Sequence, residues 1–392
     1  MKNLWDENES KKYLSDLELR VYTSNLLGRS DELVLHGGGN TSVKSVVDGE
    51  DILFVKGSGW DLVTIKKEGF APVKLKTLEK MAKLEVLSDS DMVRLQKEAM
   101  IDKSAPNPSV EAILHAIIPF KFVDHTHADA VVTISNSIHG KRLIQEIFPK
   151  FLIIPYVMPG FLLAQTIYQM TKNFDWSKCA GIILHNHGIF TFDNDAKTSY
   201  SKMIDAVTLA EDFLNANANI SFETPIEKEF DIEILQKVIT DAKGYEVVCS
   251  VDNSPLALYY ASLSSEKFKR GVLTPEHIIR TKREPLLLQA NDDIDDIQIA
   301  VENYKNNYIA YFDSFSSNEV MLNPTPNYVV VKDFGVISFG KNVQEANIIK
   351  DIVSHTMSAV LKGDILGGYQ SINLQESFMM EYWELEQAKL QK

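Results

Sequence analysis

The spacing of hydrophobic and polar positions predicts a mixed α/β chain. From Asp6 to Gly28, leucine and valine recur at helical spacing, which predicts an amphipathic helix that ends at the glycine. Short aliphatic runs bounded by glycine or polar residues predict strands. The predicted strands are residues 33–35, 52–56, 181–184 and 189–192, and further helices are predicted at 76–86, 109–118 and 196–214.

One long uncharged stretch separates Lys150 from Lys172, and its length approaches that of a membrane span. Pro155, Pro159 and Gly160 interrupt it, and several polar side chains follow them. Because these residues break a continuous helix, we expect a buried strand, a turn and a helix instead.

An internal repeat suggests how the chain is divided. Residues 182–192 and 329–339 share a strand–glycine–strand pattern 147 positions apart, and a helix-like run follows each, at 197–214 and 345–361. The same offset carries Asp129 onto Glu276 and Pro108 onto Pro255. This indicates duplication of one supersecondary block, the alternative being a chance likeness of two strand pairs.

The polar segment 215–229, which contains Pro225, is the expected linker between two domains, at 1–222 and 230–392. The second copy lacks the groups that carry chemistry in the first. At a constant offset, His125 falls on Val272, His127 on Thr274, His187 on Phe334 and Glu111 on Leu258. Their joint replacement favours one site that only the first copy keeps.

The histidine pattern predicts a metal site. His125-Thr126-His127 on a strand would place both imidazoles on one face, because strand side chains alternate. His187, with His185 as its rival, would supply a third ligand from a neighbouring strand. Three neutral imidazoles with an open fourth position suit catalytic Zn²⁺, although another divalent metal would also fit. Glu111 is the candidate general acid/base, its alternative role being that of an ordinary residue at a helix N-terminus.

Three glycine- and serine-containing loops predict a phosphate cradle. Gly39, Asn40 and Thr41 follow a predicted strand, Ser58 and Gly59 end another, and Ser109 lies near a helix N-terminus. Such loops can turn backbone N–H groups toward an anion, although each by itself is more often an ordinary turn. No dinucleotide fingerprint is present, so we expect no NAD.

Composition narrows the classes of function. Forty Lys+Arg against 54 Asp+Glu give a net charge of −14, which argues against nucleic acid or an anionic membrane as partner. With two cysteines and an acidic N-terminus that does not resemble a signal peptide, we expect a cytoplasmic protein.

Taken in order, these motifs resemble the class II aldolase/adducin family. The matching pieces are Gly39-Asn40-Thr41-Ser42, Ser58-Gly59, Pro108-Ser109-Val110-Glu111, His125-Thr126-His127 and Asn186-His187-Gly188. Residues 155–161, 273–282 and 381–390 are similar to the aldolase part of bifunctional rhamnulose-1-phosphate aldolase/short-chain dehydrogenase proteins.

The resemblance implies an α/β fold: a three-layer α/β/α unit around a mixed, largely antiparallel sheet, plus a second, degenerate copy of part of it. It implies a homo-oligomer that cleaves a ketose 1-phosphate, such as rhamnulose 1-phosphate, to dihydroxyacetone phosphate and an aldehyde. Two other activities stay open: a sugar-phosphate 4-epimerase or a dehydratase. A third alternative is a non-catalytic, adducin-like binding module. Val110 stands where simpler sugar-phosphate aldolases carry a second phosphate-binding serine, so part of that contact is in doubt.

Overall fold

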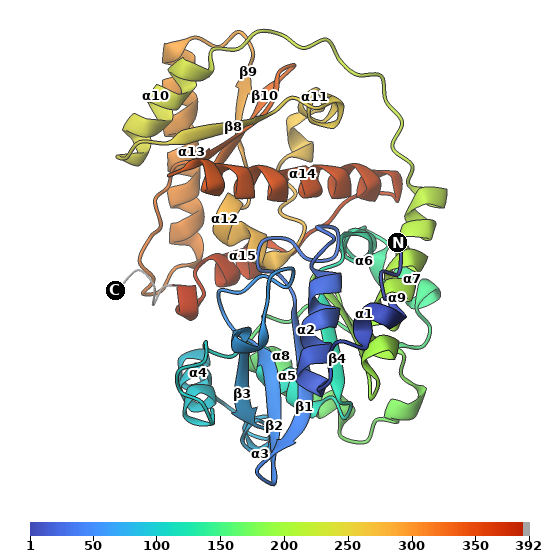
Figure 1. The fold of residues 1–392 in the computed structure, drawn as a ribbon. Helices are drawn as coiled ribbons and strands as arrows, with labels where there is room; N and C mark the ends of the chain where they lie inside the picture. The colour runs from blue at the N-terminus through green and yellow to red at the C-terminus, as the bar shows by residue number, and fades with distance from the viewer. Residues whose placement is uncertain (387–392) are drawn as a thin grey trace. The chain divides into compact units, whose positions relative to one another are not determined.

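The computed structural model describes residues 1–386, and in it the chain forms two compact units (Figure 1). Unit 1 consists of Met1–Ser135 and Gly140–Asn215. Unit 2 consists of Asn136–His139 and the chain from Ala216 onward. Segment 381–390, which is similar to the bifunctional aldolase proteins, lies partly outside the described residues.

Unit 1 is built on a seven-stranded sheet in the order β3-β2-β1-β4-β7-β6-β5. The strands are β1 (Asn40–Val47), β2 (Glu50–Lys56), β3 (Phe70–Lys74), β4 (Phe122–Thr126), β5 (Phe151–Ile154), β6 (Gly181–Leu184) and β7 (Gly188–Asp193). Every pairing is antiparallel except that of β5 with β6. The predicted mixed, largely antiparallel sheet is confirmed.

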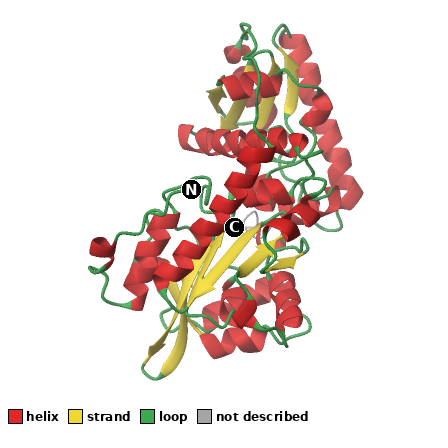
Figure 2. Cartoon of the chain, turned by 90° about the vertical axis from the view of Figure 1, so that its right-hand side faces the viewer, coloured by secondary structure: helices red, strands yellow, loops and turns green. Residues whose placement is uncertain are grey.

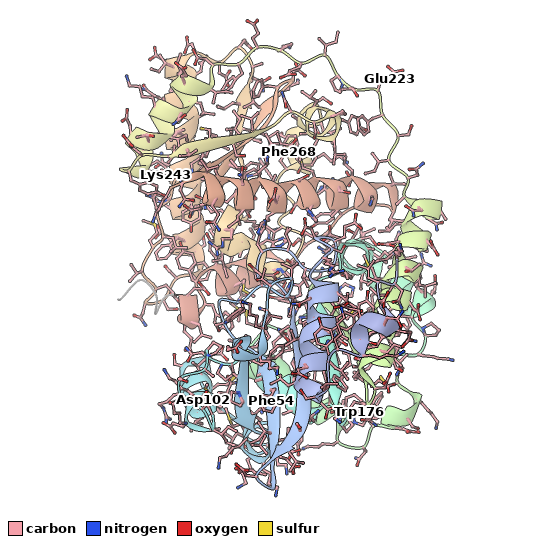
Figure 3. All side chains as sticks on the ribbon, in the orientation of Figure 1. Phe54, Asp102, Trp176, Glu223, Lys243 and Phe268 are labelled. Atoms are coloured by element: carbon pink, nitrogen blue, oxygen red, sulfur yellow. The ribbon has the colours of Figure 1, made fainter. Side chains whose placement is uncertain are left out.

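Helices lie on both sides of this sheet, which makes three layers (Figure 2). Helices α3 (Leu75–Met81), α4 (Asp89–Glu98), α5 (Ala112–Ile117) and α8 (Phe161–Thr171) contribute to the apolar clusters on one face. Helices α2 (Asp16–Leu27) and α9 (Ala196–Asn217) pack on the other face, where Phe54 joins Val43 and Phe122 (Figure 3). The remaining helices are α1 (Glu7–Ser10), α6 (Asp129–Ser135) and α7 (Gly140–Ile147).

Unit 2 has a four-stranded sheet in the order β8-β11-β10-β9. Its strands are β8 (Val248–Asp252), β9 (Leu286–Gln289), β10 (Tyr328–Lys332) and β11 (Gly335–Gly340). Its helices are α10 (Ile232–Lys243), α11 (Pro255–Ala261), α12 (Ile278–Thr281), α13 (Ile294–Phe315), α14 (Val343–Ile365) and α15 (Leu374–Glu381). Apolar side chains of α10 and α13 form a core with this sheet, whereas α11 and α14 contact β11.

The unit 2 sheet repeats part of the unit 1 sheet. The order β8-β11-β10-β9 reproduces β4-β7-β6-β5, and in both only the last pair is parallel. In the hairpins, Ile182 faces Phe190 as Val329 faces Ile337, so the two hairpins are 147 positions apart. The predicted second, degenerate copy is confirmed at the level of topology.

The constant offset is wrong upstream of these hairpins. His125 pairs with Phe190, and Val251 pairs with the equivalent Ile337, so His125 corresponds to Val251 and not to Val272. By the same register His127 corresponds to Asn253 rather than Thr274. The offset is 126 positions at β8 and 134 at β9, because the connections before β9 and β10 are longer in unit 2.

Several predicted elements also differ from the structure. Residues 33–35 lie in a loop rather than a strand, and the single helix expected over 6–28 is two helices. The break occurs because Ser15 caps α2, with Glu18 completing a capping box. The uncharged stretch after Lys150 is strand β5 and helix α8, and none of the described helices is both long and apolar enough to span a bilayer.

Candidate metal centre

Three histidines from two neighbouring strands meet at one end of the unit 1 sheet. His125 lies near the end of β4 and is fully buried, and His127 follows the strand. His187 lies in the tight turn between β6 and β7, where Asn186 adopts a φ of 60°. Asparagine tolerates this left-handed conformation, so the turn can place His187 beside β4.

The imidazoles form a compact cluster with metal-ligand geometry. One ligand nitrogen from each of His125, His127 and His187 lies within 4.8 Å of the other two. The Nε2 atoms of His125 and His127 are 3.0 Å apart. Within the described residues, the cluster of possible ligands contains His187 and not its rival His185, whose Nδ1 lies 2.6 Å from the side-chain oxygen of Asn186.

The orientation of His125 follows from its second nitrogen. Its Nδ1 donates to the carbonyl oxygen of Ile189 at 3.1 Å, which leaves the Nε2 lone pair on the side of the cluster. Such a carbonyl acceptor is the usual support of a ligating imidazole. Asp124, the residue before His125, points to the opposite face of β4, where it pairs with Arg20 and accepts from Ser199.

Glu111 is the carboxylate of the cluster. It stands at the N-terminus of α5 with 5% of its side chain exposed. Its Oε2 lies 3.4 Å from His125 Nε2, and its Oε1 lies 3.8 Å from His187 Nε2. Among the described residues Oε1 has no hydrogen-bond partner, so one carboxylate oxygen is available beside the imidazoles.

A buried relay holds the other oxygen of Glu111. The side-chain amide of Asn40 donates to Glu111 Oε2 at 2.6 Å, and Asn40 Oδ1 accepts from His115 Nε2. Ser42 completes the relay, with its hydroxyl 2.7 Å from His115 Nδ1. Burial, reinforced by the nearby His125, Lys44 and Arg20, holds the pKa of His115 well below its ordinary value, so the ring is neutral.

This relay changes the roles expected for two residues of the phosphate cradle. Both ends of the Asn40 amide are occupied, so its side chain orients Glu111. Thr41 is fully buried on the opposite face of β1, where its hydroxyl contacts Ser24 on α2 at 2.8 Å. Because successive strand residues point to opposite faces, the Thr41 side chain cannot reach a substrate beside Asn40.

The other cradle residues do come together. Ser58 N donates to the carbonyl oxygen of Asn107, and Ser109 N donates to that of Lys56, so the two serine-containing loops run side by side. The Ser109 hydroxyl also accepts from Glu111 N at 3.2 Å, which ties this loop to the carboxylate. Gly59 has a φ of 85°, a conformation that favours glycine.

Lys56 joins these loops to the glycine-rich turn. Its Nζ donates to the carbonyl oxygen of Gly37 at 3.1 Å, and burial lowers its pKa to about 8. Gly39 has a φ of 64°, and an added Cβ would lie 2.7 Å from the carbonyl oxygen of His125. The turn therefore approaches the metal-site strand more closely than any side chain would allow.

Unit 2 carries no equivalent of this cluster within its described residues. The positions of His125, His127 and His187 correspond to Val251, Asn253 and Phe334. Two of these assignments differ from those made with a constant offset. The inference that the second copy lost its metal ligands is unchanged.

From the sequence, His115 is expected to be a structural histidine, and Lys56 is given no role of its own. His115 follows Glu111 by four residues, and this spacing on a helix places two side chains on the same face. Lys56 ends an otherwise apolar strand directly before Gly57-Ser58-Gly59. Both signals were readable in the sequence, but neither specifies a partner.

Two protein-family models match the chain, one in each half. The family model described as Class II Aldolase and Adducin N-terminal domain matches residues 18–214, half of the chain. The model described as Aldolase class II, second domain, matches residues 228–390.

The chain is also similar to a solved structure and to a curated bacterial protein. The N-terminal class II aldolase domain of a conserved protein from Thermoplasma acidophilum is 39% identical, with a TM-score of 0.50 over 55% of this chain and 99% of that chain. A Bacillus subtilis (strain 168) protein named "Uncharacterized oxidoreductase YuxG" is 29% identical over 418 residues. That match includes 100% of this chain, which spans 60% of the length of that curated relative.

Proposed function

Because the chain belongs to the class II aldolase and adducin family, we propose that unit 1 catalyses a metal-dependent, reversible aldol cleavage. The proposed substrate is a ketose 1-phosphate such as rhamnulose 1-phosphate, and the products are dihydroxyacetone phosphate and an aldehyde such as lactaldehyde. The observation that carries the proposal is the cluster of three imidazoles with the Glu111 carboxylate beside them.

The donor set suits a divalent cation, with Zn²⁺ as the first choice. His125, His127 and His187 would hold it, since three neutral imidazoles leave a fourth position open for substrate oxygens. When bound, the ion would act as a Lewis acid that polarises the carbonyl and the adjacent hydroxyl of the sugar. The Ile189 carbonyl keeps His125 in the tautomer that this ligation requires.

Glu111 would carry the proton. Carbon–carbon cleavage converts the hydroxyl beside the breaking bond into the aldehyde carbonyl, and the proton of that hydroxyl passes to solvent. The other fragment is the enediolate of dihydroxyacetone phosphate, which becomes product when one carbon takes up a proton that Glu111 has gained from solvent. Glu111 Oε1, which accepts no hydrogen bond from the described residues, would donate that proton and would remove it again in the direction of synthesis. The Asn40 amide holds the other oxygen, so the carboxylate keeps its orientation during the transfer.

The neighbouring loops would bind the phosphate. Gly39, the backbone of Asn40, Ser58, Gly59 and Ser109 supply small residues and hydroxyls. The buried cation of Lys56 adds a positive charge among them. Binding the phosphate at a fixed distance from Glu111 would set the register of the reacting carbons.

Incubation of the purified chain with rhamnulose 1-phosphate and Zn²⁺ tests the proposal. We expect dihydroxyacetone phosphate to appear together with an equal amount of aldehyde, and we expect about one zinc per chain by elemental analysis. His127→Ala should lose zinc and activity together, because the variant removes one of three ligands.

Two results would replace the proposal. An epimerised sugar phosphate without fragments would identify a 4-epimerase, which uses the same bond cleavage without releasing the pieces. A folded protein that binds no divalent metal and leaves every sugar phosphate unchanged would identify a binding module.

A further inference from the structure

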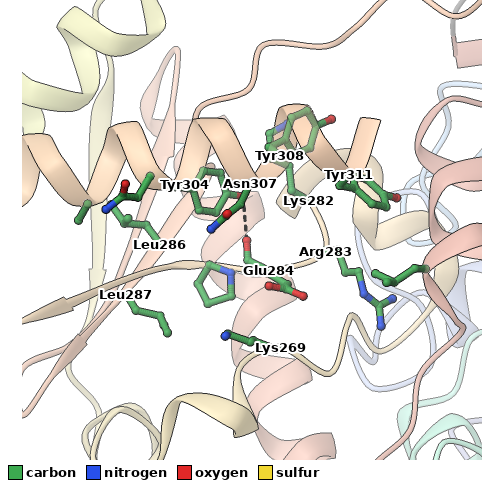
Figure 4. A pocket seen from close by; sticks show the side chains of 14 residues that line it. Lys269, Lys282, Arg283, Glu284, Leu286, Leu287, Tyr304, Asn307, Tyr308 and Tyr311 are labelled. Atoms are coloured by element: carbon green, nitrogen blue, oxygen red, sulfur yellow. Dashed lines mark hydrogen bonds between the residues drawn. The ribbon is translucent and has the colours of Figure 1, made fainter. Parts of the chain in front are cut away.

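Unit 2 contains a cavity of about 440 Å³, and none of the residues that line it belongs to unit 1. One wall is the segment from Lys282 to Leu287, and the opposite wall is a face of α13 (Figure 4). Lys269 and Leu374 complete the lining. The volume falls within the range of small-molecule sites.

The wall formed by α13 is polar where a structural helix would be aliphatic. Its lining residues, at positions 300, 303, 304, 307, 308 and 311, follow helical spacing and so form one stripe. They are one alanine, two asparagines and three tyrosines. Ile297 and Val301 of this helix belong to the core with the sheet, and Ala300 and Tyr304 also pack against that core. Tyr308 belongs to an aromatic cluster with Phe378 and Tyr382. Figure 4 shows Tyr304 and Asn307 extending from the helix toward the opposite wall, where the Tyr304 hydroxyl donates to the carbonyl oxygen of Glu284 at 3.0 Å.

Arg283 is anchored on one side only. Its Nη1 donates to the carbonyl oxygen of Ile372 at 2.9 Å and to the hydroxyl of Ser377. Its Nε is buried and has no hydrogen-bond partner among the described residues. The guanidinium is thus held in place with part of its donor fork unused, an arrangement suited to a carboxylate or phosphate.

Two further polar atoms of the same lining make no hydrogen bond to the described residues. The Tyr311 hydroxyl is buried, and no described residue hydrogen-bonds to it. Lys282 Nζ likewise makes no hydrogen bond within residues 1–386; it lies over the Tyr308 ring at 3.4 Å and 3.7 Å from Glu381 Oε1. Lys282 also has a φ of 62°, a strained conformation for a residue with a side chain.

Charge favours an anionic occupant. The lining has three basic residues, Lys269, Lys282 and Arg283, and one acidic residue, Glu284. Burial raises the pKa of Glu284, which weakens its opposition to an incoming anion. Buried donors without partners are rare in native proteins, and the two in this lining, Arg283 Nε and the Tyr311 hydroxyl, are better explained by a ligand than by packing.

We propose that this cavity binds a small hydroxylated organic anion, with its carboxylate or phosphate on Arg283 and Tyr311 and its hydroxyls on Asn303 and Asn307. The two asparagines are exposed, so the ligand can enter from their side. Eight helical residues separate Asn303 from Tyr311, a distance of about 12 Å, which suits a chain of a few carbons.

Isothermal titration calorimetry of the full chain tests the proposal with three probes: glycerol 3-phosphate, glycerate and uncharged glycerol. At least one anion should bind with a Kd on the order of 1 mM or tighter, and glycerol should not bind. Tyr311→Phe should weaken binding about tenfold, because it removes one hydrogen bond to a charged group. Its midpoint temperature of thermal unfolding should be unchanged or higher, since no described residue hydrogen-bonds to the hydroxyl.

Arg283→Lys keeps the charge but removes the planar fork, and should weaken binding at least as much as Tyr311→Phe. Tyr245→Phe, in unit 2 but outside the cavity lining, is the matched control and should bind like the unaltered chain. The proposal is overturned if neither anion binds, or if Tyr311→Phe and Arg283→Lys both bind as tightly as the control.

Discussion

The two carboxylate oxygens of Glu111 have different surroundings. Oε2 accepts from Asn40, whereas Oε1 lies beside His187 and is not hydrogen-bonded by any described residue. A carboxylate held by one oxygen can transfer a proton with the other and keep its direction. Glu111 therefore has the arrangement expected of a general acid/base.

Glu111→Gln isolates this proton transfer, because glutamine has the same shape and cannot exchange the proton. We expect kcat to fall about 10²–10⁴-fold, the usual contribution of general acid–base catalysis. Zinc content measured by elemental analysis should stay at the level of the unaltered protein, since the three imidazoles are untouched. Full activity in this variant would remove Glu111 from the mechanism.

His115 should make the protein sensitive to mild acid. Its folded pKa is depressed, so the unfolded chain takes up a proton near pH 6.5 while the folded chain does not. Its contribution to stability is therefore complete above pH 6.5 and is lost as the pH falls, by about 1.4 kcal/mol per pH unit for one proton.

His115→Gln removes the titration while keeping a donor and an acceptor for Asn40 and Ser42. Urea unfolding at several pH values should show a shallower loss of stability between pH 6.5 and 5 than in the unaltered chain. Equal slopes in the two proteins would mean that His115 is protonated in the folded state.

The residue scale also shows what the sequence could and could not predict. His125 and His127 could be paired because strand alternation is a local rule. Asn40 could not be assigned to Glu111, because that contact depends on β1 pairing with β4 in the register that places Asn40 opposite His125. Hydrogen-bond partners 71 positions apart follow from topology, which local patterns do not contain.

At the scale of elements, the equivalent hairpins β6–β7 and β10–β11 each contain a glycine at the corresponding position, Gly188 and Gly335. A Cβ on Gly188 would lie 2.5 Å from the carbonyl oxygen of Thr126, and one on Gly335 would lie 2.4 Å from that of Asp252. These contacts support the register in which Thr126 corresponds to Asp252. Each hairpin can approach the neighbouring strand only because a glycine is present.

Gly188→Ala and Gly335→Ala form a matched pair. Each should lower the free energy of unfolding by about 1–3 kcal/mol, because the new methyl group overpacks a backbone contact. Only Gly188→Ala should also weaken zinc binding, since its Cβ would lie 2.9 Å from the His125 ring. Denaturant unfolding and zinc titration measure the two effects; zinc affinity unchanged in Gly188→Ala would contradict the placement of His125 in the site.

Elements with strong periodic signals were predicted correctly, and connections were not. The hairpin at 181–193 and helix α9 were readable from local pattern. The upstream offset failed because insertions in the connections before β9 and β10 leave no periodic trace. The loop at 33–35 was predicted as a strand because a run of three aliphatic residues is compatible with either structure.

At the scale of the whole molecule, one topology serves two purposes. Unit 1 extends the shared four strands with β1, β2 and β3, and β1 supplies Asn40 and Ser42 to the relay. The described part of unit 2 has neither these strands nor counterparts of the three clustered histidines, yet its longer connections include the segment before β9 that lines the cavity. The duplicated sheet therefore supports different groups in each unit.

This division predicts that metal binding stabilises one unit alone. Zinc at about a thousandfold excess over its Kd should stabilise the structure that contains its ligands by about 4 kcal/mol. Amide hydrogen exchange with and without chelator should show this gain in β4 and β7, which position His125 and His187. Strands β8 and β11 have the same topology and no ligands, so they are the internal control and should exchange at the same rate in both conditions. Equal protection of both strand pairs by zinc would mean that the two units unfold as one cooperative body, and protection of neither would mean that the imidazole cluster does not hold the metal.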